Sequence, residues 1–395
     1  MIMKKRVFIA TIISILNVQI SFSQEVYTPV LEQIERNSTE LRALRQRADA
    51  EVAAHHTGLA PDNPTVEAGY LWGMPSAVGP RIDVAVRQEF DFPTVYVWQR
   101  RLAAVRDSSA EYQYRYGRQQ ILLAAKQTCI RLIYSNAIVA LRRADADRAR
   151  QMAEAYDKML QQGGATQLEV NRARLVLTTT ESALAEAEME RDRCRAELQA
   201  LNGGVLLQFD CAEFPVAVLP VDTAAWLSSV SAADPSLAIA RVENDAAQSA
   251  VSLARSRTLP RWSIGYMGEF VEGNTFQGVT FGLSLPLWGN IGRVRQARLN
   301  AEAVQSHGDA IRLQLSSRYR SLLQEAQRLV ALIAQMDSTL PTADADLLHR
   351  AFLAGELSLT DYLLEQSLSS SALARRLAAQ CDLHQLLAEM YSFKL

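Results

Sequence analysis

An internal duplication constrains the fold of this chain more than any other feature. The segment from Thr39 to Tyr70 aligns without gaps on the segment from Pro235 to Tyr266. Further on, Pro93 matches Pro286, with the spacing shorter by three residues. A chain repeated in this way is expected to fold as two copies of one unit. Identical residues at equivalent positions are Leu41 and Leu237, Arg45 and Arg241, Pro64 and Pro260, and Gly69 and Gly265.

Each copy reads in the order helix, two strands, very long helix, tight turn and long returning helix. The first copy is predicted to span residues 24–202, with strands at about 64–73 and 81–92. The second is predicted to span 223–395, with strands at about 261–271 and 277–288. Residues 203–222 contain two prolines and few helix signals, which predicts an irregular connector beside the helices. The expected fold class is mainly α with a small β portion.

The first 23 residues have the pattern of an export signal. Lys4, Lys5 and Arg6 precede an apolar run from Val7 to Ile20, and small residues follow it. No later segment has the roughly 18 uninterrupted apolar residues that a spanning helix needs. If the exported chain meets a bilayer, we expect strands to cross it.

The predicted strands alternate between apolar and polar residues. From Arg81 to Phe92, every second residue is apolar except Gln88, and the residues between are mostly charged. Runs of about ten residues match tilted membrane strands, although a soluble sheet with one wet face has the same pattern. The candidate lipid-facing residues are Val84, Val86, Phe90, Phe281, Leu283 and Leu285.

The helices are unusually long. No proline interrupts the helical pattern from Thr94 to Gln161, which predicts a helix of about 100 Å. In the second half, apolar residues recur every three or four positions from Ala301 to Leu340, which is typical of coiled-coil packing. Pro341 is predicted to bend or break this second long helix, because proline removes a backbone donor.

Both long helices are predicted to end in glycine turns. Glycine permits the left-handed conformation at a helix end, and Thr166 and Ser358 can cap the returning helices with the help of Glu169 and Asp361. These turns are the tips of two helical hairpins, and the first is expected to be the shorter. The tip residues are Gly163, Gly164, Ala165 and Thr166, and Gly355, Glu356, Leu357 and Ser358.

Four strands in one chain cannot close a membrane sheet. Open sheet edges are not tolerated in lipid, because their backbone groups would lack hydrogen-bond partners. Two copies would give a barrel of eight strands that side chains fill, whereas three copies would give twelve and leave a water-filled lumen. A conduit therefore favours a homotrimer.

The chain resembles the TolC-type outer-membrane efflux family over essentially its whole length after the signal. The residues that carry the resemblance are Asn63-Pro64, Leu259-Pro260, the segment Leu283-Ser284-Leu285-Pro286-Leu287-Trp288, Arg293 with Ala297 and Ala301, and the glycine turns at Gly163 and Gly355. The resemblance implies a trimer with a twelve-stranded barrel in the outer membrane and a helical barrel in the periplasm. It implies no cofactor. It also implies a gate at the periplasmic end, a periplasmic adaptor bound at the tips, and an inner-membrane pump of the RND type.

The four cysteines allow two interpretations. In an oxidising compartment Cys194 and Cys211 are the best pair for a disulfide, which would join a helix end to the following segment. Alternatively they are small buried residues, as Cys129 and Cys381 are expected to be.

Charge and histidine content exclude several functions. Lysine plus arginine number 41 against 43 aspartate plus glutamate, which gives no basic surface for nucleic acid. His55 and His56 are adjacent, and adjacent side chains on a helix point apart, so we expect a solvated helix end and no metal site.

Three other classes of protein remain open on the sequence. A periplasmic adaptor would also carry a signal and a helical hairpin, but with compact β-rich domains beside a single hairpin. A coiled-coil scaffold would explain the helices and leave the alternating strands unexplained. An exported hydrolase needs a catalytic constellation, and the sequence contains no nucleophile elbow, phosphate loop or zinc motif. We therefore predict that the chain is not an enzyme.

Overall fold

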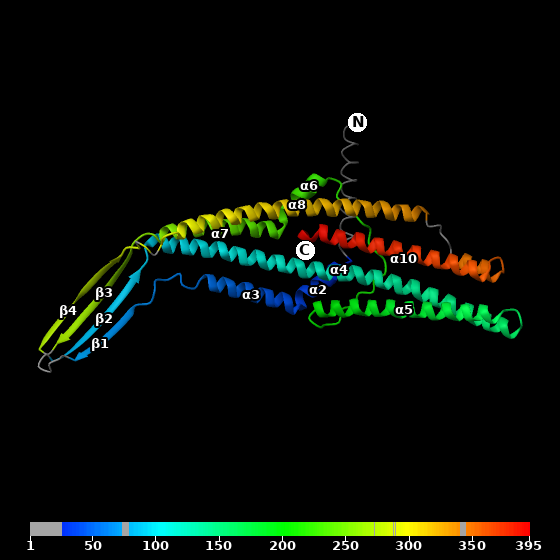
Figure 1. Ribbon diagram of the computed structural model, residues 1–395, viewed down its shortest axis with the longest axis horizontal. Helices are drawn as coiled ribbons and strands as arrows, with labels where there is room; N and C mark the ends of the chain where they lie inside the picture. The colour runs from blue at the N-terminus through cyan, green and yellow to red at the C-terminus, as the bar shows by residue number, and fades with distance from the viewer. Residues whose placement is uncertain (1–25, 73–78, 272, 287, 289, 340–344) are drawn as a thin grey trace, which may run out of the picture. The chain divides into compact units, whose positions relative to one another are not determined.

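The computed structural model describes residues 26–72, 79–271, 273–286, 288, 290–339 and 345–395. The predicted export signal lies outside these residues. The elements, labelled as in Figure 1, are α2 (Thr28–Asn37), α3 (Thr39–His55), β1 (Thr65–Trp72), β2 (Pro80–Phe90), α4 (Pro93–Gln161), α5 (Gln167–Leu201), α6 (Thr223–Ala233), α7 (Pro235–Ser256), β3 (Arg261–Val271), β4 (Asn274–Ser284), α8 (Arg293–Thr339), α9 (Ala345–Leu353), α10 (Leu359–Met390) and the 3-10 turn η2 (Ser392–Lys394).

The order of elements repeats along the chain. A helix, two strands, a long helix and a returning helix occur first as α3, β1, β2, α4 and α5, and again as α7, β3, β4, α8–α9 and α10. The chain divides into two compact units. The sheet unit comprises Leu44–Tyr116 and Ser231–Leu315, and the hairpin unit comprises Met1–Ala43, Gly117–Val230 and Ser316–Leu395.

The sheet unit contains one antiparallel sheet in the order β1-β2-β3-β4, seen side by side in Figure 1. The β2–β3 pair joins the two copies of the repeat, with Val86 opposite Tyr266. β4 begins at Asn274, earlier than the predicted 277, because Gly273 directly before it has a φ of 83° and allows the chain to reverse. It ends at Ser284 and not at the predicted 288, just before Pro286, which has no N–H to donate to a ladder.

The hairpin unit has its main core where α2 packs on the long helices. Ile34, Ile130 and Ile133 are almost completely buried in a cluster with Leu198 and other apolar residues. His384 stacks on Phe214 with the ring centroids 5.0 Å apart. Burial lowers the pKa of His384 to about 4, so this ring is neutral at pH 7.

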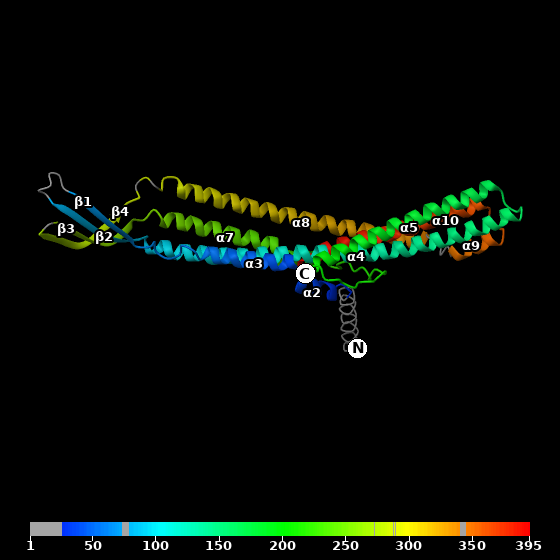
Figure 2. The same ribbon diagram turned by 90° about the horizontal axis from the view of Figure 1, so that it is seen from below.

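Two helical hairpins complete this unit. Figures 1 and 2 both show α5 returning beside α4, and Figure 2 shows α10 beside α9. α8 ends at Thr339, and the predicted break at Pro341 lies outside the described residues. None of the helices within the described residues has a stretch long and apolar enough to cross a membrane.

Candidate functional site

The register of the sheet places most of the apolar residues of all four strands on one face. Val86 of β2 lies opposite Val66 of β1 and Tyr266 of β3, and Tyr266 lies opposite Val279 of β4. This face is open to the surroundings in the chain: Val279 is 76% exposed and Phe281 is 73% exposed. Strand residues on this apolar face are Val66, Ala68, Tyr70, Trp72, Ile82, Val84, Val86, Phe90, Trp262, Ile264, Tyr266, Phe270, Val279, Phe281 and Leu283.

Five of the six candidate lipid-facing residues therefore share one face. Val84, Val86 and Phe90 come from β2, and Phe281 and Leu283 from β4. The Phe90 ring stacks on Trp262 of β3 with the ring centroids 4.5 Å apart. The sixth candidate, Leu285, follows the end of β4 and is not a strand residue.

The opposite face of the sheet is mostly polar, although Leu71, Met267 and Phe276 also lie on it. Arg81 pairs with Asp83 through Nε at 2.8 Å and with Glu269 through Nη1 at 3.1 Å. Glycines also occupy this face: a side chain on Gly265 would place Cβ 2.6 Å from the Val86 carbonyl oxygen. The sheet thus has one mainly polar face and one mainly apolar face, each continuous across both copies of the repeat.

The two hairpin turns have the same geometry. Gly163 and Gly355 both have positive φ, 73° and 79°. The next residue donates back into the preceding helix in each turn, Gly164 N to Met159 O at 2.8 Å and Glu356 N to Ala351 O at 3.0 Å. Residues 162–166 and 354–358 link the helices, so the two turns are equally long and the prediction of a shorter first tip was wrong. The tips differ in side chains, because Gly164 and Ala165 replace Glu356 and Leu357.

The caps of the returning helices also correspond. Glu169 N donates to Thr166 Oγ1 at 3.3 Å, and Asp361 N donates to Ser358 Oγ at 3.2 Å. The Glu169 carboxylate accepts from the Thr166 backbone N and from Thr166 Oγ1, each at 2.8 Å, and these two hydrogen bonds lower the pKa of Glu169. Thr166 and Glu169 therefore form a capping box.

Replacing Thr166 by alanine is expected to destabilise the first turn of α5 by about 1 kcal/mol, because the cap accepts from an otherwise unpaired amide. Amide hydrogen exchange should become several-fold faster at Leu168–Val170. Thr179→Ala is the matched control, since the Thr179 hydroxyl donates to Leu175 O inside the same helix and caps nothing. Equal exchange in both variants would contradict the capping assignment.

Near the tips, aromatic residues join the two hairpins. Phe352 of α9 stacks on Tyr362 of α10 with the ring centroids 4.4 Å apart, and lies 6.4 Å from Tyr156 of α4. Met152 and Val170 belong to the same cluster, so α4 and α5 share one core with α10.

A buried polar group also links the hairpins. Asp145 of α4 is 4% exposed, and Ser370 of α10 donates from Oγ to its Oδ2 at 2.6 Å. Arg148 lies 2.8 Å from Asp145 Oδ1 and Arg142 lies 3.5 Å from Oδ2. Sequence reasoning missed this group, although Asp145 stands four and seven residues before the buried Ala149 and Met152, the spacing of a helix seam.

The proposed disulfide is not formed in the structure. All four cysteines are free thiols. Cys194 is buried with its Sγ 3.9 Å from Ser135 Oγ, whereas Cys211 Sγ lies 3.2 Å from Glu213 O. The two thiols make separate contacts, which agrees with the alternative of small packed residues.

His55 and His56 do not point apart as expected. His55 Nδ1 lies 3.0 Å from Asp107 Oδ1, and His56 Nε2 lies 2.9 Å from Asp107 Oδ2. They converge because α3 ends at His55, so helical geometry does not govern His56. Within the described residues, no three His, Cys, Asp or Glu side chains are grouped to hold a metal ion.

The fold that these elements define is that of outer-membrane channels. The solved OprN channel matches it with a TM-score of 0.77, at 15% identity, over 94% of this chain and 90% of that chain. The Campylobacter jejuni CmeC outer membrane channel matches with a TM-score of 0.77, at 16% identity, over 94% of this chain and 86% of that chain.

A third channel, Neisseria gonorrhoeae MtrE in its open state, matches with a TM-score of 0.74, at 15% identity, over 93% of this chain and 88% of that chain. These matches confirm the expected fold of the single chain, which is mainly α with a small β portion. No family model and no curated protein matches the chain.

Proposed function

We propose that the chain is one subunit of an outer-membrane exit duct, which carries substrates passively from an export system to the outside. The observation that carries this proposal is the apolar face of the four-stranded sheet, exposed across all its strands. Such a face is stable in contact with lipid and unfavourable in water. The channel fold supports the same function, and a channel of this kind is not an enzyme.

The edges of the sheet favour assembly. Within the described residues β1 and β4 each pair on one side only. Four antiparallel strands alternate in direction, so β4 of one copy can pair antiparallel with β1 of the next. Three copies would close a barrel of twelve strands with a water-filled lumen. We therefore propose a homotrimer in outer-membrane lipid.

The hairpin tips are the proposed docking surface for a periplasmic adaptor. The two turns, with Gly163 to Thr166 and Gly355 to Ser358, present similar backbones. An adaptor bound there would connect the duct to an inner-membrane pump, for which we propose the RND type. Gating would act at the same end, by rearrangement of the two hairpins that Asp145 and Ser370 link. The alternatives of an adaptor or a periplasmic scaffold leave the exposed apolar face unexplained.

The mass of the assembly extracted from the outer-membrane fraction tests this function. We expect three copies of the chain after subtraction of bound detergent, and ion conductance when the same sample is added to a planar bilayer. A monomer in the soluble periplasmic fraction would overturn the channel and favour the adaptor or the scaffold.

A further inference from the structure

Arginines gather at the end of the sheet where the helices of the sheet unit meet the strands. The register brings together the end of β2, the start of β3 and the end of β4, with Phe90 opposite Trp262 and Arg261 opposite Ser284. Figures 1 and 2 both show α4, α7 and α8 meeting this end of the sheet. The arginine cluster on these helices, and on the residue after α7, consists of Arg100, Arg101, Arg106, Arg255, Arg257, Arg293, Arg295 and Arg298.

No acidic residue is interspersed among these arginines. Three segments contain all eight of them and no aspartate or glutamate, namely residues 93–106, 246–260 and 285–301. The carboxylates that border the first segment are already paired. Asp91 lies 2.7 Å from Arg261 Nε, and Asp107 lies within 3.0 Å of the two histidines that follow α3 to its end. The chain therefore leaves the charge of the arginine cluster uncompensated.

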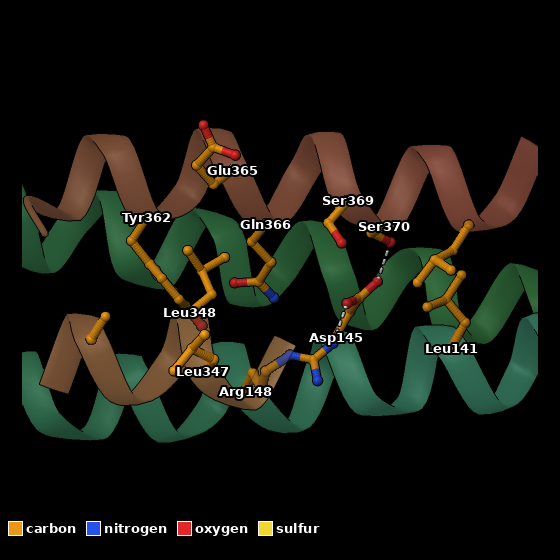
Figure 3. Close-up of a pocket in the computed structure, with 12 residues that line it drawn as sticks. Leu141, Asp145, Arg148, Leu347, Leu348, Tyr362, Glu365, Gln366, Ser369 and Ser370 are labelled. Atoms are coloured by element: carbon orange, nitrogen blue, oxygen red, sulfur yellow. Dashed lines mark hydrogen bonds and ion pairs between the residues drawn. The ribbon is translucent and has the colours of Figure 1, made fainter. Parts of the chain in front are cut away.

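The side chains of the arginine cluster are open to the surroundings. All eight are exposed, and none of them forms an ion pair within the described residues. Arg101 lies over the Trp98 ring, 5.2 Å from its centroid. Other arginines of the chain hold carboxylates, as Figure 3 shows for Arg148 beside Asp145. Unpaired positive charge gathered at one end of the sheet attracts anions.

Exposed apolar residues lie next to the arginine cluster. Trp288 is 79% exposed and Ile291 is 77% exposed, and both follow β4 and precede Arg293. On α4, the exposed Val97 stands one turn before Arg101. Tryptophan is enriched at membrane interfaces, where its ring lies at the level of the headgroups. From β4 into α8, the chain thus passes from apolar strand residues to an exposed tryptophan and then to arginines, the order of hydrocarbon, interface and headgroup.

We propose that the arginine cluster binds the anionic headgroups of phospholipids in the periplasmic leaflet of the outer membrane. This inference rests on the proposed function, which places the apolar face of the sheet in that membrane. A guanidinium donates two parallel N–H groups to a phosphate, and arginines beside a membrane-spanning segment attract anionic lipids. The cluster continues the apolar face, so its ligand needs an acyl chain as well as a phosphate. A phospholipid has both, whereas a soluble anion has only the charge.

The test reconstitutes the detergent-extracted full chain into vesicles of equal parts phosphatidylglycerol and phosphatidylcholine. Bromine atoms near the headgroup end of the acyl chains, on one lipid at a time, quench tryptophan on contact. Trp98 and Trp288 lie next to the arginine cluster and report on it. We expect a preference for phosphatidylglycerol of about threefold or more at low salt. The preference should shrink in about 0.5 M NaCl, because salt screens exposed charges.

Two sets of substitutions locate the site. The first combines Arg293→Gln, Arg295→Gln and Arg298→Gln on α8. The second combines Arg255→Gln and Arg257→Gln at the end of α7. Each set should reduce the preference for phosphatidylglycerol by at least half, and sedimentation of each variant establishes that the oligomer still forms.

The matched control combines Arg312→Gln, Arg320→Gln and Arg328→Gln. These side chains are also exposed and lie further along α8, where Arg312 is paired with Asp309. The control removes the same charge as the first set and should leave the lipid preference unchanged.

Four results would overturn the proposal. Equal quenching by the two lipids in the parent chain would remove headgroup recognition while the membrane position stands. An equal loss of preference in the control would show that only the total charge of the chain matters. Loss of the oligomer with an unchanged preference in both sets would assign the arginines to contacts between copies. Absence of quenching by either lipid would overturn the proposed function as well.

Discussion

Arginine in place of Val86 is expected to prevent assembly in the outer membrane. Val86 lies near the middle of β2 on the apolar face, between Val66 and Tyr266. An arginine facing lipid near the middle of the bilayer costs about 2–4 kcal/mol, and the trimer would contain three such residues. The measurement is the amount of heat-modifiable trimer in the outer-membrane fraction, compared with the parent chain at equal expression. We expect the trimer to be largely lost.

Ala85→Arg is the matched control, one residue earlier on the opposite face. Ala85 lies directly opposite Glu67 of β1, so the new guanidinium would have an ion-pair partner on the polar face. This variant should assemble as the parent chain does. The same contrast is expected between Phe281→Arg and Thr280→Arg on β4. If Val86→Arg and Ala85→Arg assembled equally well, the apolar face would not be the lipid face.

Asparagine in place of Asp145 is expected to destabilise the hairpin unit by about 3–5 kcal/mol, the usual cost of removing one partner of a buried ion pair. The asparagine would have nearly the same shape and would leave Arg142 and Arg148 without the carboxylate that both contact. The measurement is the loss of near-ultraviolet circular dichroism on heating. Sedimentation beforehand establishes that the oligomer forms.

Asp147→Asn serves as the control for Asp145→Asn. Asp147 stands two residues further along α4, and its side chain is 57% exposed with a single ion pair to Arg150. Exposed pairs of this kind contribute about 0–1 kcal/mol, so the unfolding temperature should hardly change. Equal changes in unfolding temperature in the two variants would show that the Asp145 carboxylate stabilises the hairpin unit no more than the exposed Asp147 carboxylate does.

The sequence predicted the order of elements because its signals are local and strong. Alternation over eight to eleven residues gave the strands, and glycine followed by a capping residue gave both hairpin turns. Strand ends were less accurate, since β4 starts where a single glycine, Gly273, reverses the chain. In the sequence, such a turn is indicated by a single residue.

The side-chain contacts could not be predicted in the same way. Asp145 and Asp147 stand in the same charged stretch, and only the packing of α10 against α4 buries one of them. The pairing of His55 and His56 with Asp107 depends on the residue at which α3 ends. A sequence pattern does not predict the end of a helix to a single residue. Cys194 and Cys211 are close enough in sequence for a bond, yet each thiol has a different neighbour.

The duplication provides, within one chain, a counterpart of the strand pairing that we propose between copies. In the repeat, β3 corresponds to β1 and β4 corresponds to β2, so pairing of β4 with β1 of the next copy would repeat the antiparallel pairing of β2 with β3. The apolar residues of β4 and β1 would then continue one face from copy to copy, as Val86 and Tyr266 do within the chain. Each chain thus already contains, in β2 and β3, an example of the strand pairing by which its copies would join into a ring.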